Sequence, residues 1–160
     1  MGIFAQVFSK GDKVVNLGVG IIPYVNYSGY SNKVLPISGS FEYGLFDNLF
    51  DEHSAIGVGG YIAYTSWESK GQNDWTVSDF ILGARGAFHY QFVDKLDTYA
   101  GVMFGYDVVS YSEAHQDIAG SGVASSFFTG ARYYFTDNLA AFGELGYGVA
   151  ALQLGVSFKF

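Results

Sequence analysis

Residues 151–160 read Ala-Leu-Gln-Leu-Gly-Val-Ser-Phe-Lys-Phe. Large apolar side chains occupy every even-numbered position of this stretch, and small or polar side chains occupy every odd-numbered position. Successive side chains of a β-strand point to opposite faces. A period of two over this length therefore predicts a strand with one apolar face and one small or polar face.

The same two-faced alternation recurs along the rest of the chain. Its segments have the length expected of tilted strands that cross a membrane, about 9–11 residues each. The pattern predicts an all-β chain that forms an eight-stranded antiparallel up-and-down transmembrane β-barrel. The predicted strands lie within residues 15–26, 35–45, 56–65, 79–92, 99–108, 123–135, 139–148 and 151–160.

The connections between these segments alternate in character. Short polar turns occupy residues 47–52, 94–97 and 136–138, and looser Gly- and Ser-rich stretches occupy 27–35, 67–78 and 112–124. The connection around Gly148 is the exception, because it has the residues of a tight turn on the side of the long loops. Short turns at one end and long loops at the other are typical of outer-membrane barrels, and they place both termini on the periplasmic side.

The composition agrees with a single all-β domain and excludes several functions. Aromatic residues make up 19 % of the 160 residues, Gly is frequent at 22, and Pro occurs only 2 times. No run of about 18 apolar residues is present to form a spanning helix. The absence of Cys excludes disulfides and Cys-based metal sites. A net charge of −7 without a basic stripe disfavours nucleic acid as a partner.

We divide the chain into an N-terminal segment, residues 1–12, and a transmembrane barrel domain, residues 13–160. Residues 1–6 are too few for a signal peptide and lack a basic region. We interpret Phe4-Ala5-Gln6 as the remnant of a removed signal peptide, with Ala5 near the cleavage site. The alternative is that these residues match such a remnant by coincidence.

A soluble lipocalin-like barrel is the alternative architecture for a chain of this length. Such a barrel turns its apolar face inward and exposes a charged exterior. The polar face of this chain is too rich in Gly, Ser and Ala, and too poor in Lys and Glu, to be a solvated exterior. Aromatic residues also gather at the ends of the predicted strands, as they do at the two interfaces of a membrane. Both observations favour the membrane barrel.

Three stretches carry a resemblance to known proteins. They are Lys10-Gly11-Asp12-Lys13-Val14-Val15-Asn16-Leu17-Gly18, Gly130-Ala131-Arg132-Tyr133-Tyr134-Phe135-Thr136-Asp137-Asn138 and Leu154-Gly155-Val156-Ser157-Phe158-Lys159-Phe160. With them the chain resembles the small outer-membrane β-barrel family of Bacteroidota, which is similar in architecture to the eight-stranded OmpX/OmpA-type barrels.

The resemblance implies an integral protein of the cell outer membrane in contact with outer-membrane lipid. Phe158 and Phe160 resemble the C-terminal signal that the barrel assembly machinery reads. A larger outer-membrane protein complex is a further partner that such a barrel would join. These motifs specify a barrel and its turns, and they specify no activity.

Charged residues on the inward side predict a network inside the barrel. A buried charge is costly unless it is paired, so we expect these side chains to bond to one another. Our main interpretation is a structural plug that fills the lumen; the alternatives are a gate, in which re-pairing opens a narrow polar path, and a proton-active or catalytic site. The predicted network consists of Glu42, Arg85, Asp107, Arg132 and Glu144, with Asp79, His89 and Lys159 on the same face.

Bulky rings on the inward face predict a lumen without an open channel. Eight strands enclose an interior only wide enough for side chains. Glycines on the same face, such as Gly130, leave room for these rings. The inward rings are predicted to be Tyr24, Tyr61, Tyr99, Phe128, Tyr134 and Phe142.

No motif predicts catalysis, a cofactor or a metal site. The candidates with the residue types of a hydrolase are Ser112, Glu113, His115 and Asp117, and they are ordinary loop residues. The acidic turn residues Asp47, Asp51 and Glu52 lack the ligand spacing of a calcium loop. We therefore predict that the protein is not an enzyme.

Two classes of function stay open at this point. The first is a structural or accessory barrel with a packed lumen, or a narrow porin-like conduit. The second is a surface recognition or adhesion barrel that binds a ligand or partner through its long loops. We expect Tyr30, Trp67 and Trp75 to lie in those loops as contact residues, although the membrane interface explains aromatic residues there equally well.

Overall fold

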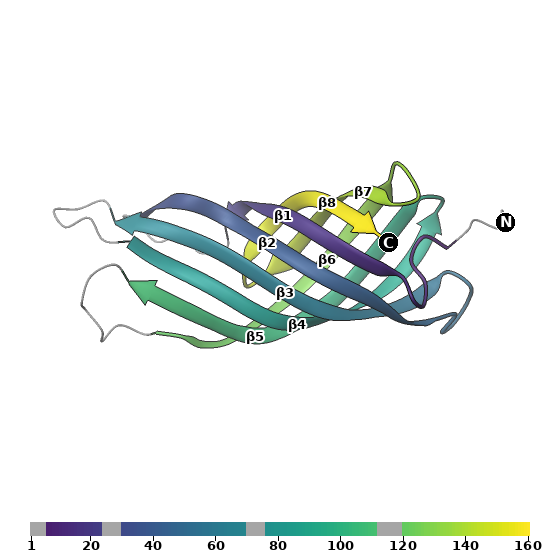
Figure 1. Cartoon of the computed structure of the whole chain (residues 1–160), viewed down its shortest axis with the longest axis horizontal. Coiled ribbons are helices and arrows are strands. Elements are labelled where there is room, and N and C mark those ends of the chain that lie inside the picture. The colour runs from purple at the N-terminus through teal and green to yellow at the C-terminus, as the bar shows by residue number, and fades with distance from the viewer. Residues whose placement is uncertain (1–5, 24–29, 70–75, 112–119) are drawn as a thin grey trace.

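The computed structural model describes residues 6–23, 30–69, 76–111 and 120–160. Each strand is hydrogen-bonded to the next in an antiparallel ladder, and β1 also pairs with β8, so that the sheet closes into a barrel (Figure 1). The predicted eight-stranded antiparallel barrel is thereby confirmed. The strands are β1 (Lys13–Pro23), β2 (Tyr30–Asp47), β3 (Ser54–Ser69), β4 (Thr76–Val93), β5 (Leu96–Tyr111), β6 (Gly122–Tyr134), β7 (Leu139–Tyr147) and β8 (Ala150–Lys159).

The two ends of the barrel differ. At the short-turn end lie the turns after β2, β4 and β6, together with the start of β1 and the end of β8 (Figure 1). At the long-loop end, β7 and β8 are joined by Gly148 and Val149 alone. Gly148 has a φ of 115°, in the left-handed region that glycine adopts without strain. The tight turn expected around this residue is therefore present.

Strands β2 to β5 are longer than the sequence pattern predicts. β3 and β4 stay paired from Ser54 with Tyr90 as far as Glu68 with Thr76, beyond the last residues that alternate clearly. In the extension of β3, the polar residues Thr65, Ser66 and Glu68 interrupt the alternation, while the backbone pairing with β4 continues. These four strands consequently extend past β1, β7 and β8 at the long-loop end (Figure 1).

The outer face of the barrel is apolar and the inner face carries the polar groups. Leu17 on β1, Leu82 on β4 and Phe127 on β6 are exposed by 59 %, 58 % and 73 %. In contrast, Glu42, Arg132 and Ser157 point inward and are buried. A soluble protein has the opposite arrangement, because its apolar side chains must leave water. In the described part of the chain, no helix is long and apolar enough to cross a membrane.

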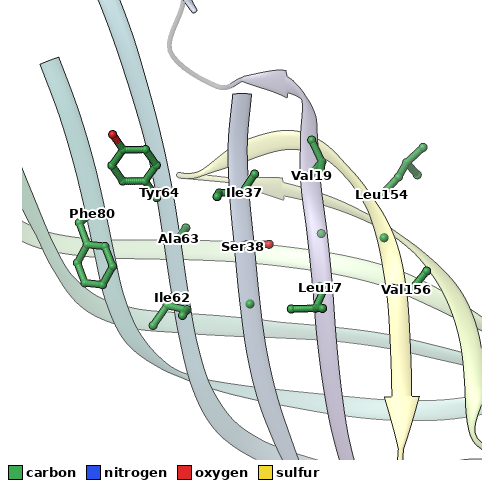
Figure 2. A pocket seen from close by; sticks show the side chains of 13 residues that line it. Leu17, Val19, Ile37, Ser38, Ile62, Ala63, Tyr64, Phe80, Leu154 and Val156 are labelled. Carbon is green, nitrogen blue, oxygen red and sulfur yellow. The ribbon is translucent and has the colours of Figure 1, made fainter. Parts of the chain in front are cut away.

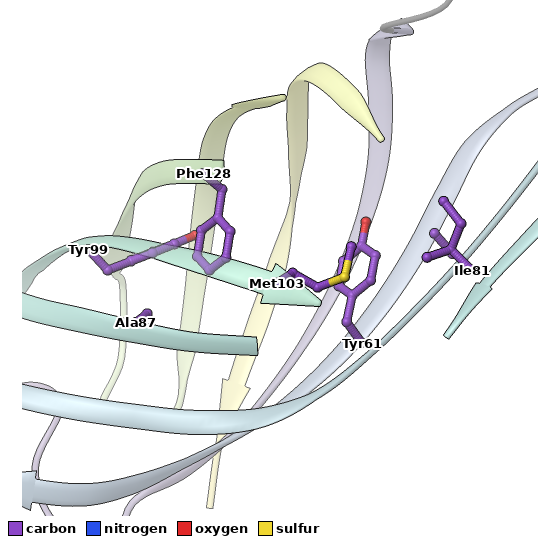
Figure 3. Close-up of a cluster of buried hydrophobic side chains, with 7 residues drawn as sticks. Tyr61, Ile81, Ala87, Tyr99, Met103 and Phe128 are labelled. Carbon is purple, nitrogen blue, oxygen red and sulfur yellow. The ribbon is translucent and has the colours of Figure 1, made fainter. Parts of the chain in front are cut away.

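The interior of the barrel is filled by side chains from several strands. Tyr61, Tyr99, Met103 and Phe128 belong to one buried apolar cluster in the middle of the lumen (Figure 3). Gly130 faces Tyr99 across the β5–β6 ladder, and a Cβ atom at Gly130 would lie 2.7 Å from the tyrosine hydroxyl. The glycine therefore gives this ring the space it occupies.

Candidate functional site

Four charged side chains meet inside the barrel near its short-turn end. They come from four different strands, and each is at a position of its strand whose side chain points into the lumen. Their side chains are at most 2 % exposed, so they form the most deeply buried polar group in the described residues. We call this group the lumen quartet: Glu42 of β2, His89 of β4, Asp97 of β5 and Arg132 of β6.

His89 bridges the two carboxylates of the quartet. Its Nδ1 lies 2.9 Å from Asp97 Oδ1, and its Nε2 lies 2.7 Å from Glu42 Oε1. A neutral imidazole has one N–H donor, and an ionised carboxylate only accepts. Both ring nitrogens must therefore carry a proton for both contacts to be hydrogen bonds to carboxylates. This geometry assigns a positive charge to His89.

Arg132 holds the same two carboxylates from the other side. Its Nη1 donates to Asp97 Oδ2 at 2.9 Å, and its Nη2 donates to Glu42 Oε2. The two cations and two anions of the quartet then balance, with each carboxylate contacting both cations. Charge balance is what allows ionised groups to stay in a dry interior, because an unpaired buried charge is far more costly than a paired one.

A second ion pair lies deeper in the lumen. Arg85 Nη2 donates to Glu144 Oε2 at 2.9 Å, and the Tyr99 hydroxyl donates to the same carboxylate oxygen at 3.1 Å. The Arg85 guanidinium also lies 3.8 Å from the centroid of the Phe128 ring, close enough for a cation–π contact. Because the Arg132 guanidinium lies 4.6 Å from the Tyr99 ring centroid, Tyr99 contacts both ionic groups.

The structure divides the predicted network differently from our expectation. Glu42, Arg85, Arg132 and Glu144 are buried and hydrogen-bonded, but as two separate groups. Asp107 belongs to neither group, and the prediction that included it is wrong: this residue lies towards the long-loop end of β5, where Oδ1 has no hydrogen-bond partner among the described residues.

Sequence reasoning missed Asp97. The sequence pattern predicts that Asp97 belongs to the turn 94–97, whereas that turn consists of Asp94 and Lys95 alone and β5 begins at Leu96. Lys95 has a φ of 62°, and this left-handed residue reverses the chain within two positions. Asp97 thus lies inside β5. It is two residues from Tyr99, which faces the lumen, and this spacing is the sequence signal that Asp97 also points inward.

The segment before β1 covers the quartet at the short-turn end. Phe8 is 2 % exposed, and its ring stacks on the His89 ring at a centroid distance of 4.0 Å. The backbone N–H of Val7 donates to Gln91 Oε1 at 2.9 Å, and the carbonyl of Val7 accepts from Lys159 Nζ at 3.0 Å. The segment is therefore tied to β4 and β8, and its aromatic ring separates the quartet from solvent.

At the long-loop end, a cavity of about 70 Å³ is lined by Trp67, Asp79 and Asp107 among others. Trp67 is part of β3 and is 6 % exposed, so its predicted place in a loop is wrong. The cause is the extension of β3 to Ser69. Trp67 lies an even number of residues after Tyr61 on this strand, so both side chains point inward. Tyr30 is the first residue of β2, while Trp75 and residues 112–117 lie outside the described residues.

The middle of the lumen leaves almost no free volume. A cavity between Tyr61, Arg85 and Glu144 measures about 10 Å³, near the lower limit for one water molecule. Within the described ranges, no cluster of three or more His, Cys, Asp or Glu side chains has the arrangement of a metal site. The interactions that the charged lumen residues make with one another are hydrogen bonds and ion pairs.

An apolar exterior, a closed antiparallel sheet and polar groups confined to the lumen together define the transmembrane β-barrel class. No protein-family model matches the sequence, and no curated protein matches it. Solved structures match its fold at low sequence identity.

The chain is similar to Ail, the attachment invasion locus protein of Yersinia pestis, with 16 % identity and a TM-score of 0.58 over 94 % of this chain and 99 % of that one. It is similar to the outer membrane protein OprG of Pseudomonas aeruginosa, with 10 % identity and a TM-score of 0.58 over 98 % and 99 % of the two chains. A de novo designed transmembrane β-barrel matches with 18 % identity and a TM-score of 0.54, over 96 % and 98 %. At these identities the likeness concerns the fold.

Proposed function

We propose that this protein is an integral outer-membrane barrel with a structural or accessory role and a lumen closed to solutes. The observation that carries the proposal is the filling of the lumen at the level of Tyr99. This ring contacts Arg132 on one side and Glu144 on the other, and the cavity beside Arg85 and Glu144 has a volume of only about 10 Å³. Two ionic groups and a ring thus occupy the space that a conduit would need.

In this proposal the barrel domain comprises residues 13–160, and its short-turn end with both termini faces the periplasm. The apolar exterior contacts outer-membrane lipid. Phe158 and Phe160, exposed by 52 % and 61 %, are contacts for the barrel assembly machinery, which passes the chain into the membrane. The proposal assigns no catalytic residue and no cofactor.

Planar-bilayer recording tests the closed lumen. The purified protein is reconstituted and compared with a protein-free preparation and with a large porin under the same voltage. We expect at most small, flickering currents, because an eight-stranded barrel encloses only side chains. Steady ohmic currents that depend on the protein would overturn the closed lumen in favour of a narrow conduit.

A second candidate function, surface recognition, is favoured by the unequal strand lengths. β2 to β5 have 16 to 18 residues, whereas β7 and β8 have 9 and 10, so one side of the barrel wall rises above the other (Figure 1). In the proposed orientation this raised side faces the exterior of the cell. A tagged barrel that co-purifies with a defined envelope protein in stoichiometric amount would support recognition or a larger complex over a solitary structural barrel.

A further inference from the structure

A hollow of about 470 Å³ interrupts the apolar exterior where β1, β2 and β3 run side by side. Its walls come from outward side chains of β1, β2, β3, β4 and β8 (Figure 2). It lies near the middle of β1 and β8, far from both polar rims. We call it the outer groove; its main wall residues are Leu17, Ile37, Ile62, Phe80 and Leu154.

The outer groove exists because β2 has a glycine on its outward face. A Cβ atom built on Gly39 would lie 3.5 Å from Ile62 Cγ1 and 3.8 Å from Leu17 Cδ2, which are ordinary contact distances. Gly39 also has no positive φ, so the backbone conformation does not require glycine there. A larger residue would fit and would fill the hollow.

We propose that the outer groove holds the acyl tail of a phospholipid from the leaflet on the short-turn side. The inference rests on the proposed membrane location and adds a specific lipid site to it. The groove continues on all sides into the apolar surface that acyl chains contact. An empty groove would leave its wall atoms without dispersion partners, and a flexible hydrocarbon chain supplies them.

A second copy of the barrel is a poorer occupant than a lipid. Two-fold association places the same patch of both subunits face to face. Two copies of the groove would then enclose an apolar void between Gly39 of one subunit and Gly39 of the partner subunit. The groove walls of both subunits would lack van der Waals contacts across such a void, whereas an acyl chain would supply these contacts.

Lys13 supplies the charge for the phosphate of the lipid. It shares the outward face of β1 with Leu17, and the four residue steps from Lys13 to Leu17 span about 13 Å along the strand, within half of a hydrocarbon core about 30 Å thick. Lys13 is exposed and pairs across the ladder with Tyr43 of β2. Lys13 is the first residue of β1 and lies at the short-turn end, which favours that leaflet.

Native mass spectrometry of the protein, released from vesicles of phosphatidylethanolamine and phosphatidylglycerol, tests the site. Gly39→Leu fills the groove, and Gly60→Leu is the matched control. Gly60 is an outward glycine of the neighbouring strand, it has open space around its Cβ position, and it does not line the groove. We expect the native barrel and Gly60→Leu to retain a single bound phospholipid, and Gly39→Leu to lose it.

A charge variant tests the other end of the lipid independently. Lys13→Gln should lower the occupancy by phosphatidylglycerol about fivefold, the contribution of one lysine near an anionic surface, while Lys95→Gln should not. If Gly39→Leu fails to fold, the comparison of Lys13→Gln with Lys95→Gln tests the lipid site by itself. Equal lipid retention in all variants that insert into vesicles overturns the groove site only. A native protein that does not enter vesicles overturns the membrane location as well, and a dimer lost only in Gly39→Leu assigns the groove to a second copy.

Discussion

The ring of Phe8 is stacked on the ring of His89, with an interplanar angle of 26°. Phe8 precedes the first strand, and His89 lies in β4, so the contact joins the N-terminal segment to the interior of the barrel. Phe8 thereby keeps water from the lumen quartet, whose ionic contacts are stronger in a dry surrounding than in water.

Phe8→Ala should destabilise the barrel by about 3–5 kcal/mol, because it leaves a cavity over His89 and admits water to the quartet. Urea unfolding in detergent or vesicles measures the effect. Phe50→Ala is the control, since Phe50 is 86 % exposed and its loss should change stability by less than about 0.5 kcal/mol in detergent. Equal stability of Phe8→Ala and the native protein would show that the segment does not seal the lumen.

Asp97→Asn should cost about 3–5 kcal/mol, because it removes a charge that both His89 and Arg132 contact in a buried site. Asp94→Asn changes the same residue type in the exposed turn nearby and should be close to neutral. Combining Asp97→Asn with His89→Gln should cost less than the sum of the two single changes, by about 0.5–3 kcal/mol. Additive effects in the unfolding free energies would refute the bridge between these residues.

Gly155→Ala should destabilise the barrel by about 1–3 kcal/mol through overpacking. An added Cβ atom would collide with the Leu17 carbonyl oxygen and lie 2.5 Å from Phe142 Cε1. Gly143→Ala on the neighbouring strand is the control, because the nearest atom to its Cβ would be Leu154 Cδ2 at 3.4 Å. If both variants unfold at the same denaturant concentration, the close contacts of Gly155 with Leu17 and Phe142 are wrong.

Tyr90→Phe should raise the pKa of Asp51 towards its ordinary value of 3.8. The Tyr90 hydroxyl donates to Asp51 Oδ2 at 2.8 Å, and this bond holds the pKa of the exposed turn carboxyl below that value. A lowered pKa in the folded state stabilises the protein above pH 3.8, and the contribution is lost as the pH falls through the lowered value. NMR titration of the carboxyl carbon measures the shift, and an unchanged pKa in the variant would exclude the bond.

The alternation of side chains was sufficient to predict the strands and their two faces. Arg85 and Arg132, for example, fall on the inward parity in the sequence and are buried in the structure. Strand ends were less predictable. The pattern predicts connections at Trp67 and Asp97. A pattern of period two has no signal where a strand leaves the membrane, or where a two-residue turn is followed at once by a buried charge.

The sequence by itself determined the class of the fold, because each strand must present apolar side chains to lipid on one face and a filled interior on the other. Only the tertiary structure decided which charges meet. Glu42, His89 and Arg132 come from β2, β4 and β6, which are not neighbours in the sheet, so their contacts depend on how the closed barrel staggers its strands. The place of Phe8 was decided in the same way: a residue outside any repeating pattern becomes buried because its ring stacks on His89 and packs in one cluster with Val14 and Ala55 inside the closed barrel.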